Sequence, residues 1–430
     1  MNGLLASLAP DSPARQTAAP PDWKGQLQLL IVQPSPFCNL DCDYCYLPDR
    51  QNTRRMDLST LEAAATKIFA TGLPCPELTV VWHAGEPLAV PREWYLKAFD
   101  LLAKHCPESV TLTHNIQTNG VLIDDGWVTF FQDHGVRVGV SIDGPDWLHD
   151  RHRRTRDNRG THARVMRGIE ALHRGDFPFH VICVLTRESL DHPDELFDFF
   201  ANLGTIHLCL NIEEIESANR SSSLAGNVED TEHAFRQFMA RMAERLCSAN
   251  GSLAHSAPRM RIREIDDILL ALRHPGFGQQ VGNSQNLPGQ ILSIAWDGRF
   301  ATFSPELLGQ SAPGLGDLTL GNVLNDPLPP LPDDARYLRQ WSDIWQGIEN
   351  CRKSCAYFNF CRGGAPSNKL GETGRFDTTE TLFCRLTQKA VTDVVLAALD
   401  RDLPSLPQHV KPKPRFWLGE NGHNKMHNRS

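Results

Sequence analysis

The first half of the chain alternates short apolar segments with helical stretches, and this alternation constrains the fold more than any other feature. Most of the apolar segments are rich in Val, Ile and Leu, as is typical of strands covered on both faces. The candidate strands span residues 27–33, 78–83, 110–117, 136–141, 180–185 and 206–211. Repeated strand–helix units predict a parallel sheet with right-handed crossovers. Because a full barrel needs eight such units, the six found here predict an α/β protein with a partial (β/α)6, TIM-like barrel that is open on one side.

The pattern changes after the sixth strand, and a chain of 430 residues is long enough for about two or three domains. The sequence predicts a Pro/Ala-rich, disordered segment at 1–25, the barrel core at 26–250 and an irregular bridge rich in Pro and Gly at 251–345. A cysteine-rich domain with a final helix is expected at 346–400, followed by a polar, disordered tail at 401–430.

Charge and hydropathy exclude several classes of protein. A net charge of -8 gives no general attraction to nucleic acid. No segment approaches the roughly 18 apolar residues that a membrane span needs, and the N-terminus lacks the pattern of a signal peptide. We therefore expect a cytoplasmic protein without a membrane or nucleic-acid partner.

Twelve cysteines are many for a reducing compartment, where clustered cysteines indicate metal or redox chemistry. Three of them, Cys38, Cys42 and Cys45, follow the first strand with the spacing C-x3-C-x2-C. Three thiolates can hold three irons of a 4Fe–4S cluster and leave the fourth iron open to another ligand. A zinc site is the alternative, but zinc usually takes four protein ligands.

This spacing, with the aromatic Tyr46 directly after it, resembles the radical S-adenosylmethionine (SAM) superfamily. The resemblance implies that SAM binds the open iron, and that an electron from the cluster cleaves SAM to a 5′-deoxyadenosyl radical. That radical then abstracts a hydrogen atom from the substrate.

Polar segments at the ends of the next three strands support the resemblance, because functional residues of barrels gather at these ends. Ala84, Gly85 and Glu86 resemble the family's GGEP motif, with Ala84 in place of a glycine; alanine suits this place if its φ is negative. The later segments resemble positions that contact the ribose and carboxylate of SAM: Gln117, Asn119, Ser141 and Asp143. By the same resemblance, Arg153 pairs with the SAM carboxylate.

The second cysteine group consists of Cys351, Cys355, Cys361 and Cys384. Four cysteines suffice for a 4Fe–4S cluster held fully by protein, and a four-cysteine zinc site is the alternative. The spacing resembles the SPASM extension of radical SAM enzymes, which usually holds two auxiliary clusters. Phe303 and Ala365 stand where further ligands of that pattern would fall, so we expect one auxiliary cluster.

The segments around 211–216, 303–309 and 357–385 resemble cyclophane-forming peptide maturases, near the GRRM-system branch. This resemblance implies a ribosomally made precursor peptide as substrate, a carbon–carbon crosslink between an aromatic ring and a side-chain Cβ as product, and a donor such as flavodoxin or ferredoxin. Glu213, Glu214 and Glu306 are candidate bases for the final proton loss. The alternatives are sulfatase maturation, another peptide modification such as epimerisation or thioether formation, and a non-catalytic metal-binding protein.

Overall fold

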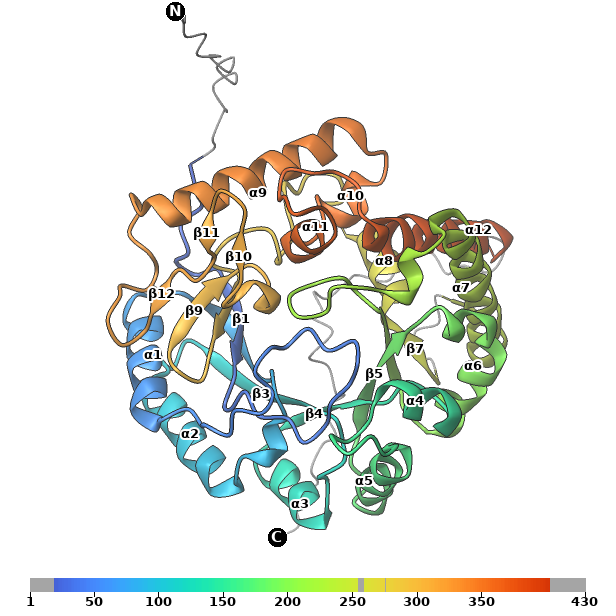
Figure 1. Ribbon diagram of the computed structural model, residues 1–430, viewed down its shortest axis with the longest axis horizontal. Coiled ribbons are helices and arrows are strands. Elements are labelled where there is room, and N and C mark those ends of the chain that lie inside the picture. Colours follow the sequence, from blue (N-terminus) through green and yellow to red (C-terminus); the bar gives the residue numbers. More distant parts are fainter. Residues whose placement is uncertain (1–18, 254–258, 275, 403–430) are drawn as a thin grey trace, which may run out of the picture.

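The computed structural model describes residues 19–253, 259–274 and 276–402. Six parallel strands form its centre, and they lie side by side in the order of the sequence (Figure 1). They are β1 (Leu27–Val32), β2 (Pro74–Trp82), β3 (Thr111–Thr118), β4 (Arg137–Ser141), β5 (Phe179–Leu185) and β6 (His207–Ile212). The predicted partial barrel and all six of its strands are confirmed, with ends that shift by no more than four residues.

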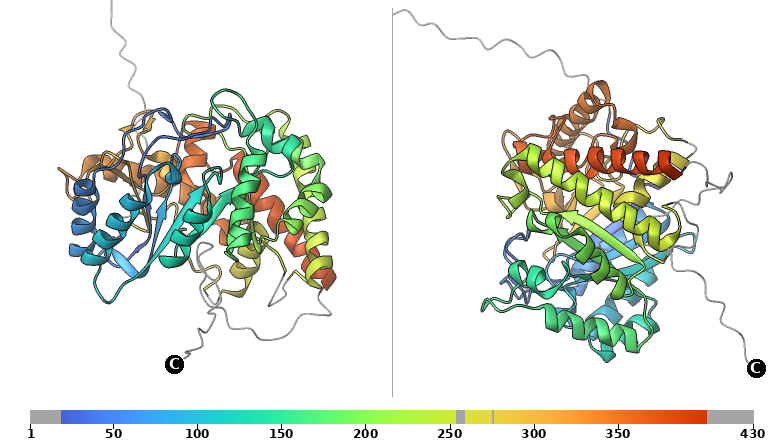
Figure 2. Two further views of the ribbon diagram at one scale, coloured as in Figure 1. Left: turned by 90° about the horizontal axis from the view of Figure 1, so that it is seen from below. Right: turned by 90° about the vertical axis from the view of Figure 1, so that its right-hand side faces the viewer.

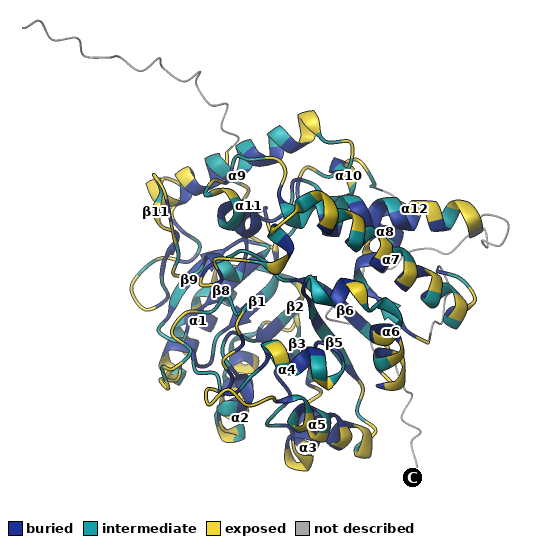
Figure 3. Ribbon diagram, turned by 45° about the vertical axis from the view of Figure 1, so that its right-hand side comes forward, coloured by how far each residue is buried: buried dark blue, intermediate teal, exposed yellow. Residues whose placement is uncertain are grey.

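Helices cover the outer face of these strands (Figure 1). They are α1 (Leu58–Ala70), α2 (Arg92–His105), α3 (Asp125–Asp133), the short α4 (Asp146–His152), α5 (His162–Arg174) and α6 (Pro193–Asn202). Burial alternates along β5, where Val181 and Cys183 are buried in the core shared with the helices and His180 and Ile182 are half-buried. The half-buried set points away from that core, and Figure 3 shows the strands of the sheet mostly in the buried and intermediate colours, with the exposed residues on the surrounding helices and loops.

The sheet extends beyond the six predicted strands on both edges. Residues 251–345, predicted to be an irregular bridge, contain β7 (Arg261–Ile262), which pairs with β6, and β8 (Ile291–Ile294), which pairs with β1. Antiparallel β9 (Arg299–Thr302) and β12 (Gly321–Asn322) continue the sheet beyond β8. Strands of two to four residues are too short to show a period in the sequence, which explains why they were not predicted.

The C-terminal region packs on the barrel. It consists of α9 (Ala335–Ser354), α10 (Phe358–Cys361), α11 (Pro366–Thr373) and a π-helical segment (Cys384–Ala390) that continues into α12 (Val391–Asp402). Helix α12 lies against α7 (Val228–Asn250) and α8 (Arg263–Arg273), as Figure 2 shows for α7 and α12. Val391, Val395 and Ala398 of α12 belong to the same apolar core as the barrel.

The segment before β1 is fixed at one point. Trp23 is buried and donates from its indole nitrogen to the Tyr337 hydroxyl at 2.8 Å. The prediction of disorder up to residue 25 is therefore wrong for Trp23, because burial of its large ring stabilises this segment against α9. Residues 1–18 of the segment predicted to be disordered lie outside the described residues. The same is true of residues 403–430 of the predicted tail. Among the helices of the described part, none is both long and apolar enough to cross a membrane.

Candidate active site

The loop after β1 carries Cys38, Cys42 and Cys45, and contacts from distant residues hold its backbone. Arg50 donates to the carbonyl of Cys42 at 2.9 Å, and Arg156 donates to the carbonyl of Cys38 at 2.8 Å. These charged donors satisfy carbonyl groups that a strand or helix would otherwise pair. The loop is therefore held in shape by the surrounding chain.

The thiols of this loop are set in a low-dielectric environment. Burial raises the pKa of Cys38 and of Cys42 to about 12. Thiolates there need a positive partner, which irons would supply. Three thiols on one loop are the donor set that a 4Fe–4S cluster with one open iron would take, whereas zinc usually takes four protein ligands.

The turn after β2 approaches the cysteine loop closely. A Cβ on Gly85 would lie 2.3 Å from the carbonyl oxygen of Ser35, and its φ is +94°, so only glycine fits there. Ala84 has a φ of +67°. The condition of a negative φ is therefore not met at Ala84: the turn keeps the left-handed backbone that the glycine of the motif would adopt, at a cost of roughly 1–2 kcal/mol.

Glu86 joins the ends of two strands through its side chain. Its carboxylate accepts hydrogen bonds from the backbone N–H groups of Leu88 and Asn119, each at 2.8 Å, and from the Thr118 hydroxyl at 2.7 Å. Asn119 in turn donates to the Asn39 side chain at 2.7 Å and approaches the Cys38 sulfur at 3.7 Å. Glu86 thus supports the strand ends beside the cysteine loop rather than presenting a free carboxylate.

Gln117 and Ser141 lie on the neighbouring strands β3 and β4, and the Gln117 side chain donates to the Ser141 hydroxyl at 3.0 Å. Gly139 of β4 is paired with Gln117, and a Cβ there would be 2.0 Å from the side-chain oxygen of Gln117 and 2.3 Å from His180 Nε2. The two predicted SAM-contacting side chains are therefore brought together, and the absence of a side chain at 139 makes room for them.

Asp143 is buried and binds three partners. It accepts from the Tyr44 hydroxyl, from Arg153 Nε at 2.9 Å and from the backbone N–H of Val184 at 2.9 Å. Burial by itself would raise the pKa of Asp143, but the guanidinium of Arg153 outweighs it and holds this pKa below its usual range. Arg153, expected to pair with the SAM carboxylate, is paired here with Asp143.

The sequence analysis missed Tyr44. Its hydroxyl joins the cysteine loop to the end of β4, and its ring lies under the Arg153 guanidinium at 5.5 Å. The sequence feature that could have indicated Tyr44 is its position between Cys42 and Cys45, which holds its ring beside the cysteines of the loop.

Two of the three predicted bases belong to a group of buried carboxyl groups near Tyr46. We call this group, which consists of Glu214, Glu216 and Glu306, the acidic recess. Burial, with Glu306 nearby, raises the pKa of Glu214 to about 8, and burial raises that of Glu306 to about 7. Burial and the two other carboxylates also raise the pKa of Glu216, which the sequence analysis missed. Burial is the largest cause of the raised pKa of the Tyr46 hydroxyl. The three carboxyl groups and the thiol of Cys45 raise this pKa further. The recess therefore adjoins the cysteine loop.

Glu213 does not join this recess. Its carboxylate accepts from the backbone N–H of Ser223 at 2.7 Å and from the hydroxyl of the same residue. These bonds use Glu213 to close the loop after β6. Its predicted role as a base therefore has no support from its position.

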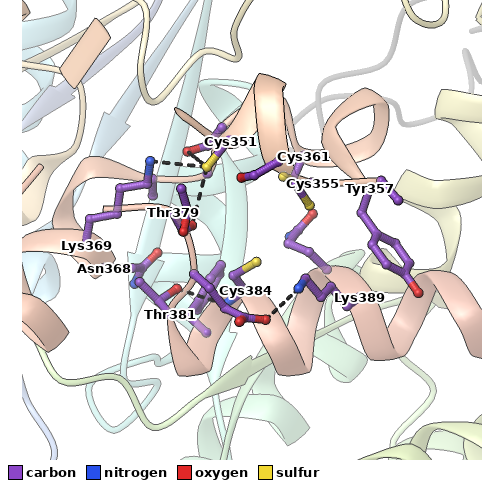
Figure 4. A pocket seen from close by; sticks show the side chains of 18 residues that line it. Cys351, Cys355, Tyr357, Cys361, Asn368, Lys369, Thr379, Thr381, Cys384 and Lys389 are labelled. Carbon is purple, nitrogen blue, oxygen red and sulfur yellow. Dashed lines mark hydrogen bonds and ion pairs between the residues drawn. The ribbon is translucent and has the colours of Figure 1, made fainter. Parts of the chain in front are cut away.

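The four C-terminal cysteines line one cavity of about 280 Å³ (Figure 4). They come from α9, α10 and the segment that begins at Cys384, so three separate elements converge. Lys369 of α11 donates to the Cys351 sulfur at 3.6 Å. Asn368, next to it, lines the same cavity and donates to the Glu214 carboxylate. Helix α11 therefore connects the cysteine cavity with the acidic recess.

The two positions where further ligands were considered are apolar and adjacent. Phe303 is fully buried in a second core that also contains Leu307 and Trp341. Ala365 immediately precedes α11, and its segment meets that of Phe303 through Ser304 and Ser367, whose hydroxyls lie 3.5 Å apart. Ala365 lines the cavity of the four C-terminal cysteines, and neither Phe303 nor Ala365 offers a thiol as a further ligand.

Comparisons with known proteins agree with this geometry. Residues 32–200 match the model of the radical SAM superfamily. An uncharacterized protein of Synechocystis sp. is 42% identical over 88% of this chain and 94% of its own length. The serine-type anaerobic sulfatase-maturating enzyme of Klebsiella aerogenes is 35% identical over 44% of this chain, which spans about half (48%) of that enzyme.

Two solved structures have a similar fold. One is anSMEcpe with bound AdoMet and the Kp18Cys peptide, with a TM-score of 0.70 and 20% identity over 88% of this chain and 99% of that one. The other is Streptococcus suis SuiB bound to the precursor peptide SuiA, with a TM-score of 0.56 and 16% identity over 84% of this chain and 76% of that one. From the family match and the cysteine loop beside the strand ends, residues 32–200 of this chain belong to the radical SAM superfamily of enzymes.

Proposed function

We propose that this enzyme modifies a ribosomally made precursor peptide by radical chemistry and joins an aromatic ring of the peptide to a nearby side-chain Cβ. Cys38, Cys42 and Cys45 would hold the SAM-binding 4Fe–4S cluster, and the four C-terminal cysteines one auxiliary 4Fe–4S cluster. The observation that supports the proposal most is the hydrogen bond from Asn368 to Glu214, because Asn368 also lines the cavity of the four C-terminal cysteines.

The cluster and SAM, when bound, would supply the 5′-deoxyadenosyl radical that takes a hydrogen atom from the peptide. The strand ends would bind and orient SAM. Gln117, Asn119 and Ser141 offer hydrogen-bonding side chains, and the turn at Ala84 and Gly85 offers backbone groups. Tyr44, Asp143 and Arg153 fix the cysteine loop against β4 and β5.

Ring closure requires the loss of one proton and one electron after the carbon–carbon bond has formed. Glu214 and Glu306 would take the proton, because a base works best when its pKa lies near the working pH. A bound auxiliary cluster would supply an electron acceptor. A flavodoxin or ferredoxin would deliver the electron that SAM cleavage consumes.

A peptide substrate is supported by the two similar folds. anSMEcpe binds the Kp18Cys peptide and SuiB binds the precursor peptide SuiA, so this fold accommodates peptides in both proteins. In this chain, Glu214 and Glu216 of the acidic recess follow β6, the last of the six barrel strands, and the recess adjoins Tyr46. A peptide with a basic side chain near its modified residue would complement that recess.

The test is an anaerobic assay with small peptides encoded beside the gene. The reconstituted enzyme, SAM and a reductant should yield a peptide that lacks two hydrogen atoms, and tandem mass spectrometry should place the loss across a ring and a Cβ. Deuterium at that Cβ should appear in 5′-deoxyadenosine. The matched control is Cys38→Ala, which should form neither product.

Sulfatase maturation is the second candidate, favoured by the 35% identity to the Klebsiella enzyme. Oxidation of a serine to an aldehyde also removes two hydrogen atoms, so mass alone does not separate the reactions. A sulfatase-derived peptide converted to the aldehyde would support this candidate and contradict the crosslink.

A further inference from the structure

Lys369 is a buried cation without a carboxylate partner. It belongs to α11, its side chain is 5% exposed, and among the described residues it forms no ion pair with Asp or Glu. Its ammonium group donates to the carbonyl of Gly347 at 3.1 Å and to the sulfur of Cys351 at 3.6 Å. A buried ammonium group is costly unless an anion neutralises it.

The space for this ammonium group is built into α9. A Cβ on Gly347 would lie 2.9 Å from Lys369 Nζ and 2.1 Å from the carbonyl oxygen of Phe376. Because Gly347 has no side chain, α11 and the chain after it can approach α9 closely enough for Lys369 to reach Cys351. The position of the charge is thus fixed by backbone packing.

A second lysine at the same cavity offers a contrast (Figure 4). Lys389 also lines the cavity, but its side chain is 27% exposed and its Nζ lies 2.5 Å from the Glu380 carboxylate. Its charge is therefore already neutralised and screened by solvent. The ammonium group of Lys369, in contrast, has a backbone carbonyl and a cysteine sulfur as its described hydrogen-bond partners.

We propose that Lys369 is a positioning residue that sets the reduction potential of the auxiliary cluster. This inference rests on the proposed function, which assigns such a cluster to these four cysteines. Reduction adds negative charge to a cluster, and a fixed positive charge at a ligand sulfur stabilises that charge. Lys369 therefore raises the potential and makes the site a better electron acceptor.

The test isolates the auxiliary site by replacing Cys38, Cys42 and Cys45 with Ala in the full chain. A redox titration followed by electron paramagnetic resonance then gives its midpoint potential. Lys369→Gln, which keeps a hydrogen-bond donor but removes the charge, should shift the potential to a more negative value. Lys369→Arg should restore most of the wild-type value, and the matched control Lys389→Gln should change it much less.

Iron content separates the possible failures. If the triple-cysteine variant binds no iron, the auxiliary cluster and with it part of the proposed function are wrong. If it binds about four irons and Lys369→Gln titrates at the unchanged potential, or no further than Lys389→Gln, the role of Lys369 is wrong. If Lys369→Gln loses iron while Lys369→Arg keeps it, Lys369 acts in the assembly of the cluster, and the inference that it sets the potential is wrong.

Discussion

Gly139 shows how one missing side chain shapes the candidate SAM site. A Cβ at this position of β4 would lie within 2.3 Å of side-chain polar atoms of both Gln117 and His180. Gly139→Ala should therefore displace Gln117 and break its bond to Ser141. A neutral hydrogen bond contributes about 0.5–1.5 kcal/mol, so SAM affinity should fall roughly 3- to 10-fold in equilibrium binding.

Gly226→Ala is the matched control for this substitution. Gly226 is exposed, its φ is -65° and no atom lies within 4 Å of the added Cβ. This variant should bind SAM as the wild type does. Equal affinities of the two variants would contradict the role given to Gly139.

Asn368 should tune the candidate base Glu214. Burial raises the pKa of Glu214, and the hydrogen bond from Asn368 opposes this by favouring the carboxylate. Asn368→Ala should raise that pKa further, so the ionised base appears only at higher pH. The acid limb of the crosslinking rate, set by a pKa of about 8, should move to higher pH, so the rate should fall below pH 8 and recover at more alkaline pH.

The pH profile of Asn350→Ala provides the comparison. Asn350 of α9 bonds to the carbonyl of Asp377, far along the chain from the acidic recess. Its variant should keep the wild-type profile. A uniform loss of rate at every pH in Asn368→Ala would argue against Glu214 as the base.

At the residue scale, the sequence predicted residue types better than orientations. Gln117 and Ser141 lie at the ends of regular strands, and Asp143 follows two residues after Ser141. The alternation of a strand fixes the face to which each side chain points. Glu213, Glu214 and Glu216 lie in the irregular loop after β6, where no period tells which carboxylate faces the recess. The backbone of Ala84 could not be predicted for the same reason, because the φ of a residue in a turn depends on the contacts around it.

Helix α11 is the element on which the two cysteine sites depend. A Cβ on Gly371 would lie 1.8 Å from the carbonyl oxygen of Ile215, so this helix touches the loop that carries Glu214. In an exposed helix, Gly→Ala stabilises by roughly 0.5–1 kcal/mol. We expect Gly371→Ala to lower the free energy of unfolding instead, because the helix and the loop must move apart.

The sign of the change decides this prediction. Urea unfolding of Gly371→Ala and wild type gives the two free energies of unfolding, and a more stable variant would show that the close contact does not constrain α11.

The position of an element such as α11 was hard to predict from the sequence. The strand positions followed from apolar runs, but the approach of α11 to the 213–216 loop joins segments more than 150 residues apart.

For the whole molecule, the C-terminal region packs partly in the barrel core and partly in the second core that contains Trp341 and Phe358. Helix α12 contributes Val391, Val395 and Ala398 to the apolar cluster that contains the barrel strands. We therefore expect one cooperative unfolding transition by calorimetry of the reconstituted enzyme. Two separate transitions would show that the region after residue 345 folds as an independent unit.

The most direct test of the central claim is iron content measured together with SAM cleavage. Anaerobically reconstituted wild type should hold about eight irons per chain and release 5′-deoxyadenosine when reduced with SAM. Replacing Cys38, Cys42 and Cys45 with Ala should leave about four irons and abolish release. Bound zinc in place of iron, or 5′-deoxyadenosine formed without these three cysteines, would contradict the account.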